Sequence, residues 1–340
     1  MPPSHKSRTL QALVHKYIDR IPTQITYTKK MGEILSTHFG VHLGELDAFL
    51  DNHMIRVDIA YERVRSKDKL VVFDWWGVGF NDEEEGYLPS ISPLAVNKDL
   101  EAYNWPDPNT ESLLNTADQI IQADKGEHFI VPNFGFVLFE RGWTLRGFEN
   151  FLIDMVMDPF FVEELLERIT EIQLVLINRF LNLGVNGGYF GDDYGAQTNM
   201  LISPNLWRTM IKPRLRRLFA PFREAGLPII MHSDGNISEI LDDLLEIGLT
   251  TLNPVQPEVI DHTWLMNTYG DRLSYYGGIS TQAVLPHGSP DEVKNSIADC
   301  IHRLAPEKTG LLIAPSHRLM SDIPIRNVEA LLEGFEKYGK

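Results

Sequence analysis

Cysteine is almost absent from this sequence. Cys300 is the only cysteine in 340 residues, which excludes a disulfide framework and a zinc site built from several thiolates. It lies in the segment 290–304, whose apolar spacing is that of an amphipathic helix. We therefore expect Cys300 to pack in the core as a small apolar side chain.

Positive charge and long apolar runs are also scarce. The chain has 31 Lys and Arg against 47 Asp and Glu, for a net charge of −16. This balance argues against nucleic acid or an anionic membrane surface as the main partner, since both require a basic face. No apolar run reaches the about 18 residues of a membrane span, and the first residues are too polar for a signal peptide. We expect a cytoplasmic protein.

The two glycine motifs that bind nucleotide phosphates are missing as well. No Gly-x-Gly-x-x-Gly follows an apolar run, and no Gly-Lys-Ser/Thr loop occurs. What the chain does contain is a repeated alternation of short apolar runs and helical patterns. The expected strands after the first third of the chain lie at 128–139, 188–192, 227–232, 250–253, 273–277 and 310–314.

This alternation predicts parallel strands joined by right-handed helical crossovers. An open doubly wound sheet and a closed (β/α)8 barrel both fit it, and the missing nucleotide motifs favour the barrel. We expect a single domain, with residues 1–127 forming an irregular N-terminal cap and the first barrel elements, and residues 128–340 forming the main barrel. In the first part, helical patterns cover 9–20 and 29–38, candidate strands 54–59 and 70–76, and a proline-rich loop 87–109.

Polar side chains follow five of the expected strands, where each strand ends. The five stretches are Gly191-Asp-Asp-Tyr-Gly195, His232-Ser-Asp-Gly235, Asn253-Pro-Val-Gln256, Gly277-Gly-Ile-Ser280 and Ala314-Pro-Ser-His317-Arg318. In a barrel, the carboxyl ends of all strands open onto one mouth, where the active sites of such folds lie. The sequence therefore predicts a small-molecule site or an active site at this mouth.

His232 and Asp234 stand out within this set. They are two residues apart, so in an extended strand their side chains point the same way. An imidazole and a carboxylate that face one space can bind a metal or transfer protons. The alternative is that His232 packs in the core and Asp234 caps the next helix.

An aromatic group brackets the acidic stretch 81–86. It consists of Trp75, Trp76, Phe80 and Tyr87. These rings either line a pocket or pack in the core, which is the usual position of large aromatic side chains.

Several of these stretches together resemble the uroporphyrinogen decarboxylase superfamily. They are Asp192-Asp-Tyr-Gly-Ala-Gln197, Ile202-Ser-Pro204, Lys212-Pro213, the strand ending at His232, Leu252-Asn-Pro254 and Tyr276-Gly-Gly-Ile279. The resemblance covers residues 128–338 well and the N-terminal third poorly. It implies a (β/α)8 barrel.

The superfamily contains two chemistries. Its decarboxylases carry an N-terminal Met-Arg-Gln-Ala-Gly-Arg-Tyr motif whose arginines bind substrate carboxylates, and that motif is absent here. Its corrinoid-dependent methyltransferases bind zinc through a His-x-Cys motif and a later cysteine. The matching positions in this chain are His232, Asp234 and His317, so both cysteines are replaced by residues that still ligate metals.

The replaced cysteines change the expected chemistry. A His/Asp/His set is a harder ligand set than thiolates and suits zinc that polarises an oxygen. The resemblance thus implies transfer of a methyl group from an oxygen-bound donor, such as a methoxylated aromatic, to the cobalt of a corrinoid. Alternatively, His232 and Asp234 hydrogen-bond the substrate and hold no metal. The corrinoid-binding pattern Asp-x-His-x-x-Gly is absent, so we expect a separate corrinoid protein as partner.

The remaining strand-end residues receive supporting roles in this hypothesis. Asp192 and Asp193 would supply a second carboxylate or a hydrogen bond to a ligand residue. Asn253 and Gln256 would orient the substrate or contact the corrinoid. Binding of the donor ring and of a carboxylate on it is assigned to Trp75, Trp76, Tyr194 and Arg318.

Two other functions stay open at this point. One is decarboxylation of another carboxylated substrate, for which Arg318 and Lys212 are the candidate cations. We expect no broader cationic pocket, so uroporphyrinogen with its many carboxylates would be repelled. The other is a non-catalytic tetrapyrrole-binding protein. A homo-oligomer is compatible with the sequence.

Overall fold

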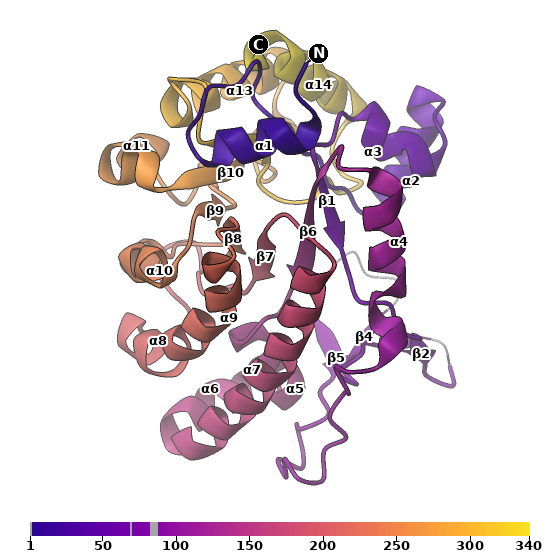
Figure 1. Ribbon diagram of the computed structural model, residues 1–340, viewed down its shortest axis with the longest axis vertical. Helices are drawn as coiled ribbons and strands as arrows, with labels where there is room; N and C mark the ends of the chain where they lie inside the picture. Colours follow the sequence, from indigo (N-terminus) through magenta and orange to yellow (C-terminus); the bar gives the residue numbers. More distant parts are fainter. Residues whose placement is uncertain (1, 69, 82–87) are drawn as a thin grey trace.

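A closed barrel forms the centre of the molecule. The computed structural model describes residues 2–68, 70–81 and 88–340. In these residues, seven parallel strands pair as neighbours in chain order (Figure 1). They are β1 (Met54–Val57), β6 (Phe129–Phe134), β7 (Gly188–Gly191), β8 (Ile229–His232), β9 (Thr251–Asn253), β10 (Ser274–Ile279) and β11 (Leu311–Pro315).

An extended segment completes the barrel between β11 and β1. The Ile313 N–H donates to the Pro22 carbonyl at 2.9 Å, and the Gln24 N–H donates to the Ile313 carbonyl at 3.0 Å. On the other side, the His53 N–H donates to the Thr23 carbonyl at 3.1 Å. Residues 22–27 therefore occupy the position of the first barrel strand. The predicted (β/α)8 barrel is confirmed.

Helices surround the strands and follow them along the chain. Their bounds are α1 (His5–Leu13), α2 (Lys29–Phe39), α3 (Leu46–Phe49), α4 (Asn115–Asp124), α5 (Phe139–Arg146), α6 (Phe148–Met157), α7 (Pro159–Asn182), α8 (Pro204–Met210), α9 (Lys212–Glu224), α10 (Leu241–Ile247), α11 (His262–Tyr269), α12 (Val284–His287), α13 (Pro290–Leu304) and α14 (Ile325–Gly339). None of them, within the described residues, is long and apolar enough to cross a membrane.

Helix α13 shows how local sequence sets these elements. Ser289 and Glu292 form a reciprocal capping box, and Pro290 occupies the first turn, where its missing N–H is harmless. Cys300 lies on the buried face and is 2 % exposed, as expected. Burial raises the pKa of its thiol to about 12, so it is an inert core side chain.

The predicted boundaries are wrong in the α8–α9 region and in the N-terminal third. The helix expected at 204–225 is divided at Ile211, because Pro213 cannot donate a backbone hydrogen bond and crowds the preceding turn. A small antiparallel sheet lies between residues 64 and 91, and of its strands the sequence predicted only the one expected at 70–76. It comprises β2 (Val64–Arg65), β3 (Val71–Phe73), β4 (Gly79–Asn81) and β5 (Pro89–Ile91).

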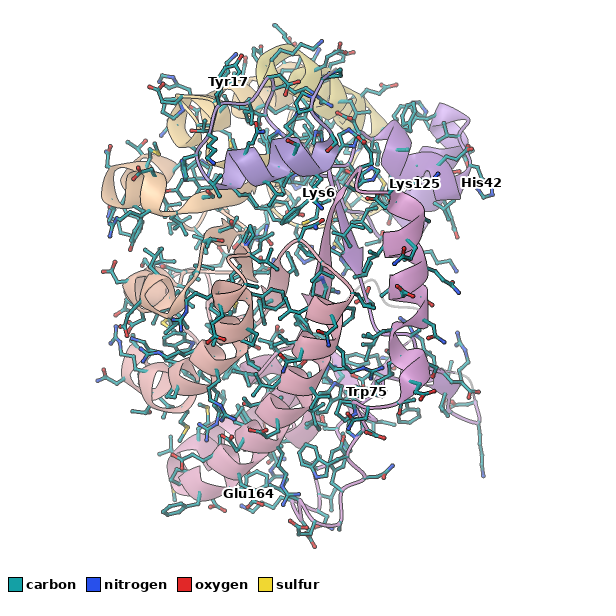
Figure 2. The ribbon with its side chains drawn as sticks, in the orientation of Figure 1. Lys6, Tyr17, His42, Trp75, Lys125 and Glu164 are labelled. Carbon is teal, nitrogen blue, oxygen red and sulfur yellow. The ribbon has the colours of Figure 1, made fainter. Side chains whose placement is uncertain are left out.

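The two ends of the barrel differ in what covers them. Figure 1 shows α1 across one end of the strands and the small sheet near the other. The labelled Lys6 and Trp75 lie toward these opposite ends (Figure 2). The small sheet extends the wall of the mouth, because Phe73 and Phe80 line the cavity described below. Tyr87 and most of the acidic stretch 81–86 lie outside the described residues.

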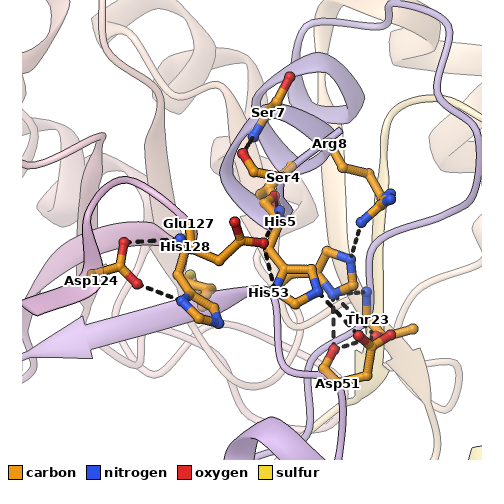
Figure 3. A network of polar contacts seen from close by, with 12 residues as sticks. Ser4, His5, Ser7, Arg8, Thr23, Asp51, His53, Asp124, Glu127 and His128 are labelled. Atoms are coloured by element: carbon orange, nitrogen blue, oxygen red, sulfur yellow. Dashed lines mark hydrogen bonds and ion pairs between the residues drawn. The ribbon is translucent and has the colours of Figure 1, made fainter. Parts of the chain in front are cut away.

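A histidine cluster ties α1 to the amino-terminal ends of β1 and β6 (Figure 3). The ring of His5 lies 4.3 Å from that of His53 and 5.0 Å from that of His128. The His53 Nε2 accepts from Arg8 at 3.1 Å, so its Nδ1 carries the proton and donates to the Asp51 carbonyl at 2.9 Å. Both ring nitrogens of His53 are thus used within the protein.

The carboxylate of Asp51 is occupied too. It forms an ion pair with Arg20 and contacts His5 at 3.1 Å. Although His5, Asp51 and His53 bring ligand atoms within 4.8 Å of one another, the two arginines take the positions that a cation would need. We therefore interpret this cluster as a structural clamp.

The clamp predicts a pH dependence of stability. Burial lowers the pKa of His53 from 6.5 to about 3, so the folded protein keeps it neutral while the unfolded chain becomes protonated below pH 6.5. Stability should therefore fall as pH drops through 6.5, at about 1.4 kcal/mol per pH unit. We expect His53→Gln to be less stable at neutral pH but to lose about 1 kcal/mol less than wild type down to pH 5.5.

Denaturant unfolding across this pH range measures the effect. The exposed His302 on α13 provides the control, since His302→Gln should follow the wild-type curve. Parallel curves for His53→Gln and wild type would show that His53 does not carry the dependence.

Candidate active site

A cavity of about 880 Å³ opens at the carboxyl ends of the strands. The strand-end residues Asp193, His232, Asn253, His317 and Arg318 contribute to its wall. The barrel thus brings residues more than a hundred positions apart to one space, because parallel staves all end at the same mouth.

His232, Asp234 and His317 form a compact group at this mouth. Each offers one ligand atom, and these three atoms lie within 4.8 Å of one another. The Nε2 of His232 is 4.0 Å from Oδ1 of Asp234, and the Nε2 of His317 is 4.0 Å from its Oδ2. The structure therefore brings together the three residues that the sequence hypothesis placed in one site.

Asn253 fixes the orientation and the tautomer of His232. The Nδ2 of Asn253 donates to the Tyr276 carbonyl at 3.0 Å, which makes its Oδ1 the acceptor for both neighbours. That oxygen accepts from the Tyr189 hydroxyl at 3.0 Å and from Nδ1 of His232 at 2.7 Å. Nε2 of His232 consequently carries the lone pair, which is the state that binds a metal.

Asp234 is the unsatisfied member of the group. Its Oδ1 is shielded from water and has no hydrogen-bond partner among the described residues. Burial raises the pKa of Asp234, and burial lowers that of His317, which favours a neutral imidazole there. A buried carboxylate oxygen without a partner is costly, so this position calls for a cation or a proton. Two imidazoles and one carboxylate are a ligand set that fits zinc.

Two glycines allow the loops that carry Asp193 and Asp234 to cross in contact. A Cβ at Gly195 would lie 2.5 Å from the Asn236 nitrogen, and one at Gly235 would lie 2.4 Å from the Gly195 carbonyl carbon. Gly235 also has a φ of 79°, which disfavours side chains. At this crossing, Oδ1 of Asp193 accepts from the Asp234 N–H at 2.8 Å.

The structure corrects the roles expected for Asp192 and Tyr194. The Asp192 carboxylate is fully buried and accepts from the N–H groups of Phe139 and Glu140 at 2.8 and 2.7 Å. It also accepts from the Tyr194 hydroxyl at 2.8 Å. Burial raises the pKa of Asp192, while these donors oppose the rise. Asp192 anchors α5, and neither residue reaches the cavity, because side chains alternate along the extended chain and only Asp193 faces inward.

Gln256 is also structural. It is 5 % exposed, does not line the cavity, and its Oε1 accepts from the Gly235 N–H at 2.8 Å. It supports the loop after β8 and does not contact the cavity space, so its expected role in orienting substrate is corrected.

Two cavity residues on α5 escaped the sequence argument. Glu140 and Arg141 both line the cavity and are 7 % and 5 % exposed. Burial and the neighbouring Asp193 raise the pKa of Glu140. The signal was present, since both follow the strand expected at 128–139, but its predicted end ran into the helix on which they lie.

The cavity wall is more cationic than the sequence suggested. Its positive residues are Lys29, Lys30, Arg56, Arg63, Arg141 and Arg318, beside the carboxyl groups of Glu33, Asp58, Asp74, Glu140 and Asp193. The expectation of no broader cationic pocket is therefore wrong. Apart from Arg318, which the sequence placed at the mouth, these cations come from the N-terminal region and from α5, where sequence patterns did not predict them. Lys212 lies elsewhere, on α9, with Asp243 and Glu246 at 2.6 and 2.7 Å.

Aromatic side chains form much of the remaining wall. Trp75, Trp76 and Phe80 line the cavity, as the pocket interpretation expected, and Phe136 joins them. The rings of Phe80 and Phe136 are nearly parallel, 8° apart, with centroids separated by 6.4 Å. The mouth thus combines an apolar aromatic side with arginines and the His/Asp group, a combination suited to a small organic anion.

Comparison with known proteins agrees with this architecture. Residues 64–338 match the family model described as uroporphyrinogen decarboxylase (URO-D). A methylated-thiol–coenzyme M methyltransferase of Methanosarcina mazei is 22 % identical over 218 residues, which are 63 % of this chain and only 56 % of that protein. A solved methyltransferase from Methanosarcina mazei has the same fold, with a TM-score of 0.74, 19 % identity and coverage of 98 % and 99 % of the two chains. Because the family model spans most of its length, this chain belongs to the uroporphyrinogen decarboxylase family.

Proposed function

We propose that this protein is a methyltransferase that takes a methyl group from the oxygen of a small donor, with methoxylated aromatics as the first candidates. The acceptor would be the cobalt of a reduced corrinoid carried by a partner protein. The observation that carries the proposal is the His232–Asp234–His317 group at the mouth of the barrel. The similarity to methyltransferases of Methanosarcina mazei supports it.

The chemistry explains why such a group is needed. When the carbon–oxygen bond breaks, its electron pair stays on the oxygen, which must be stabilised by a cation or a proton. His232, Asp234 and His317 would hold zinc, which supplies that stabilisation as a Lewis acid when bound. The reduced corrinoid supplies the electron pair that accepts the methyl group.

The side chains around the group have separate tasks in this proposal. Asn253 holds the His232 ring so that Nε2 faces Asp234 and His317. Asp193 braces the loop that carries Asp234. If no metal is bound, the same leaving oxygen requires a proton, and burial raises the pKa of both Asp234 and Glu140, so either carboxyl group can hold one.

The ligand set and the wall favour an oxygen donor on an aromatic ring. Among the His/Asp/His ligands there is no thiolate, and Cys300 is buried on α13. The aromatic wall offers rings for stacking. A methylated thiol is the second candidate donor, because the similar Methanosarcina mazei methyltransferase is named after that substrate. Decarboxylation is the second candidate reaction, because the arginines of the wall suit carboxylates.

Metal binding provides the first test. Purified protein equilibrated with zinc and dialysed should retain about one ion per chain, as in other three-ligand zinc sites. His232→Ala and Asp234→Ala should retain little, because each removes one of only three ligands. Elemental analysis measures the content. His5→Gln, in the clamp, is the matched control and should keep the wild-type content; zinc lost only in that variant would place the ion in the wrong cluster.

The bond from Asn253 to His232 provides the second test. Asn253→Ala removes the acceptor that fixes the ring, so zinc affinity and the rate of methyl transfer should fall about 10- to 100-fold, as expected for residues that orient ligands. A competitive zinc indicator and single-turnover kinetics measure the two effects. Asn327→Ala is the matched control, because this buried asparagine binds the Leu285 and Gly288 carbonyls and does not line the cavity. Wild-type zinc affinity in Asn253→Ala would contradict the positioning role.

The reaction itself is the third test. Protein incubated with a methoxylated benzoate and a reduced corrinoid protein should yield the absorbance of methyl-cobalt and the free phenol, and His232→Ala should yield neither. Omitting the corrinoid protein should abolish transfer. If a methylated thiol reacts and no methoxylated benzoate does, the thiol is the donor. Release of carbon dioxide without methyl transfer would reject the methyltransferase proposal.

A further inference from the structure

Arg141 is a buried cation in the wall of the cavity that the reaction outlined above does not use. It lies on α5, one residue after Glu140, and is 5 % exposed. The carboxylate of Asp74 accepts from its Nη1 at 2.7 Å. Asp74 is itself held in place, because its Oδ1 accepts from the N–H groups of Trp76 and Val78 at 2.9 Å each. The guanidinium is therefore fixed at one edge.

Two aromatic rings lie close to the guanidinium. Its central carbon lies 5.1 Å from the ring centre of Trp76 and 5.5 Å from that of Phe136. Both rings belong to the cavity wall. Contacts of a cation with aromatic rings leave its N–H groups available for hydrogen bonding.

One N–H donor of the guanidinium lacks a partner among the described residues. The Nε of Arg141 is buried and has no hydrogen-bond partner within the part of the chain that the structure describes. Nε and Nη2 form the side edge of the guanidinium, a fork that matches the two oxygens of a planar carboxylate. A buried donor without an acceptor is costly and requires an explanation, and a ligand in the cavity provides one.

We propose that Arg141 binds the carboxylate of the methyl donor, so that the substrate is a methoxylated aromatic acid and not a neutral ether. This inference rests on the proposed function and specifies its substrate class. Arg141 is then a specificity-determining residue, separate from the group that acts on the methoxy oxygen.

The position of Arg141 suits this role better than that of Arg318. In a methoxylated benzoate, the ring separates the methoxy oxygen from the carboxylate, so the two groups need different ends of the cavity. Arg318 follows His317 directly and therefore lies beside the group that would act on the methoxy oxygen. Arg141 lies on α5, which follows β6, and the aromatic side chains of Trp76 and Phe136 near its guanidinium can also contact the ring.

Calorimetric titration of the wild-type protein, without corrinoid, is the first arm of the test. The ligands are para-methoxybenzoate and the neutral para-methoxybenzamide, which has nearly the same size and shape. The benzoate should bind about 10- to 100-fold more tightly, the difference expected for hydrogen bonds between charged groups. Equal affinities, or no binding of the benzoate, would overturn the inference.

Variants form the second arm. Arg141→Gln should remove the preference for the benzoate, and Arg141→Lys should keep part of it, since an ammonium retains the charge but not the fork. Arg146→Gln is the matched control on the same helix, because Arg146 pairs with Asp154 at 2.7 Å and does not line the cavity. It should keep the wild-type preference. If Arg141→Gln does not fold, Arg141→Lys and the wild-type comparison still decide the question.

The outcomes separate this inference from the proposed function. Loss of the preference in Arg318→Gln, with Arg141→Gln unaffected, would assign the carboxylate to Arg318 and overturn the inference. An Arg141-dependent preference without any methyl transfer would uphold the inference and reject the proposed reaction. Methyl transfer from methoxybenzamide as fast as from the benzoate would leave the reaction intact and overturn the role of Arg141.

Discussion

The hydrogen bond from the His232 imidazole to the Asn253 side chain connects the barrel to its chemistry. Asn253 ends β9, and its amide reaches β10 through the Tyr276 carbonyl and β7 through the Tyr189 hydroxyl. The Asn253 side chain thus connects strands β7, β9 and β10 and holds the His232 ring at the end of β8. The direction of the imidazole is therefore set by the rigid strands, which hold functional groups more accurately than loops do.

The arrangement beyond His232 depends on close approach of two loops. Gly195 and Gly235 let the chain after β7 pass against the chain after β8, with no room for a Cβ at either position. At that contact Asp193 holds the backbone of Asp234, whose Oδ1 is buried and has no hydrogen-bond partner in the described part of the chain. A buried carboxylate oxygen without a hydrogen-bond partner beside two imidazoles costs stability, and such a cost is typical of residues kept for binding.

The net charge of the whole chain does not describe the charges that line its cavity. A net charge of −16 describes the surface and the solubility of the protein, whereas six cationic residues line the mouth. Asp74 pairs with Nη1 of Arg141, while Nε has no partner among the described residues, so the wall keeps a donor for an anionic group. An acidic protein can therefore accept an anionic substrate, because the field near a bound ligand comes from the residues within a few ångströms.

The sequence alone was enough to predict the barrel, which is confirmed, and to predict a candidate site at its mouth. Alternating apolar runs and helices, with polar residues at successive strand ends, are local patterns, and they sufficed to predict parallel staves and a mouth lined by His232, Asn253 and His317. Only the tertiary structure decided which of two adjacent aspartates faces the cavity. Asp193 lines it, whereas Asp192 anchors α5. It also decided that residues 22–27 close the barrel and that Arg141 reaches the mouth. These features depend on contacts between distant segments, and periodicity along the chain carries no information about them.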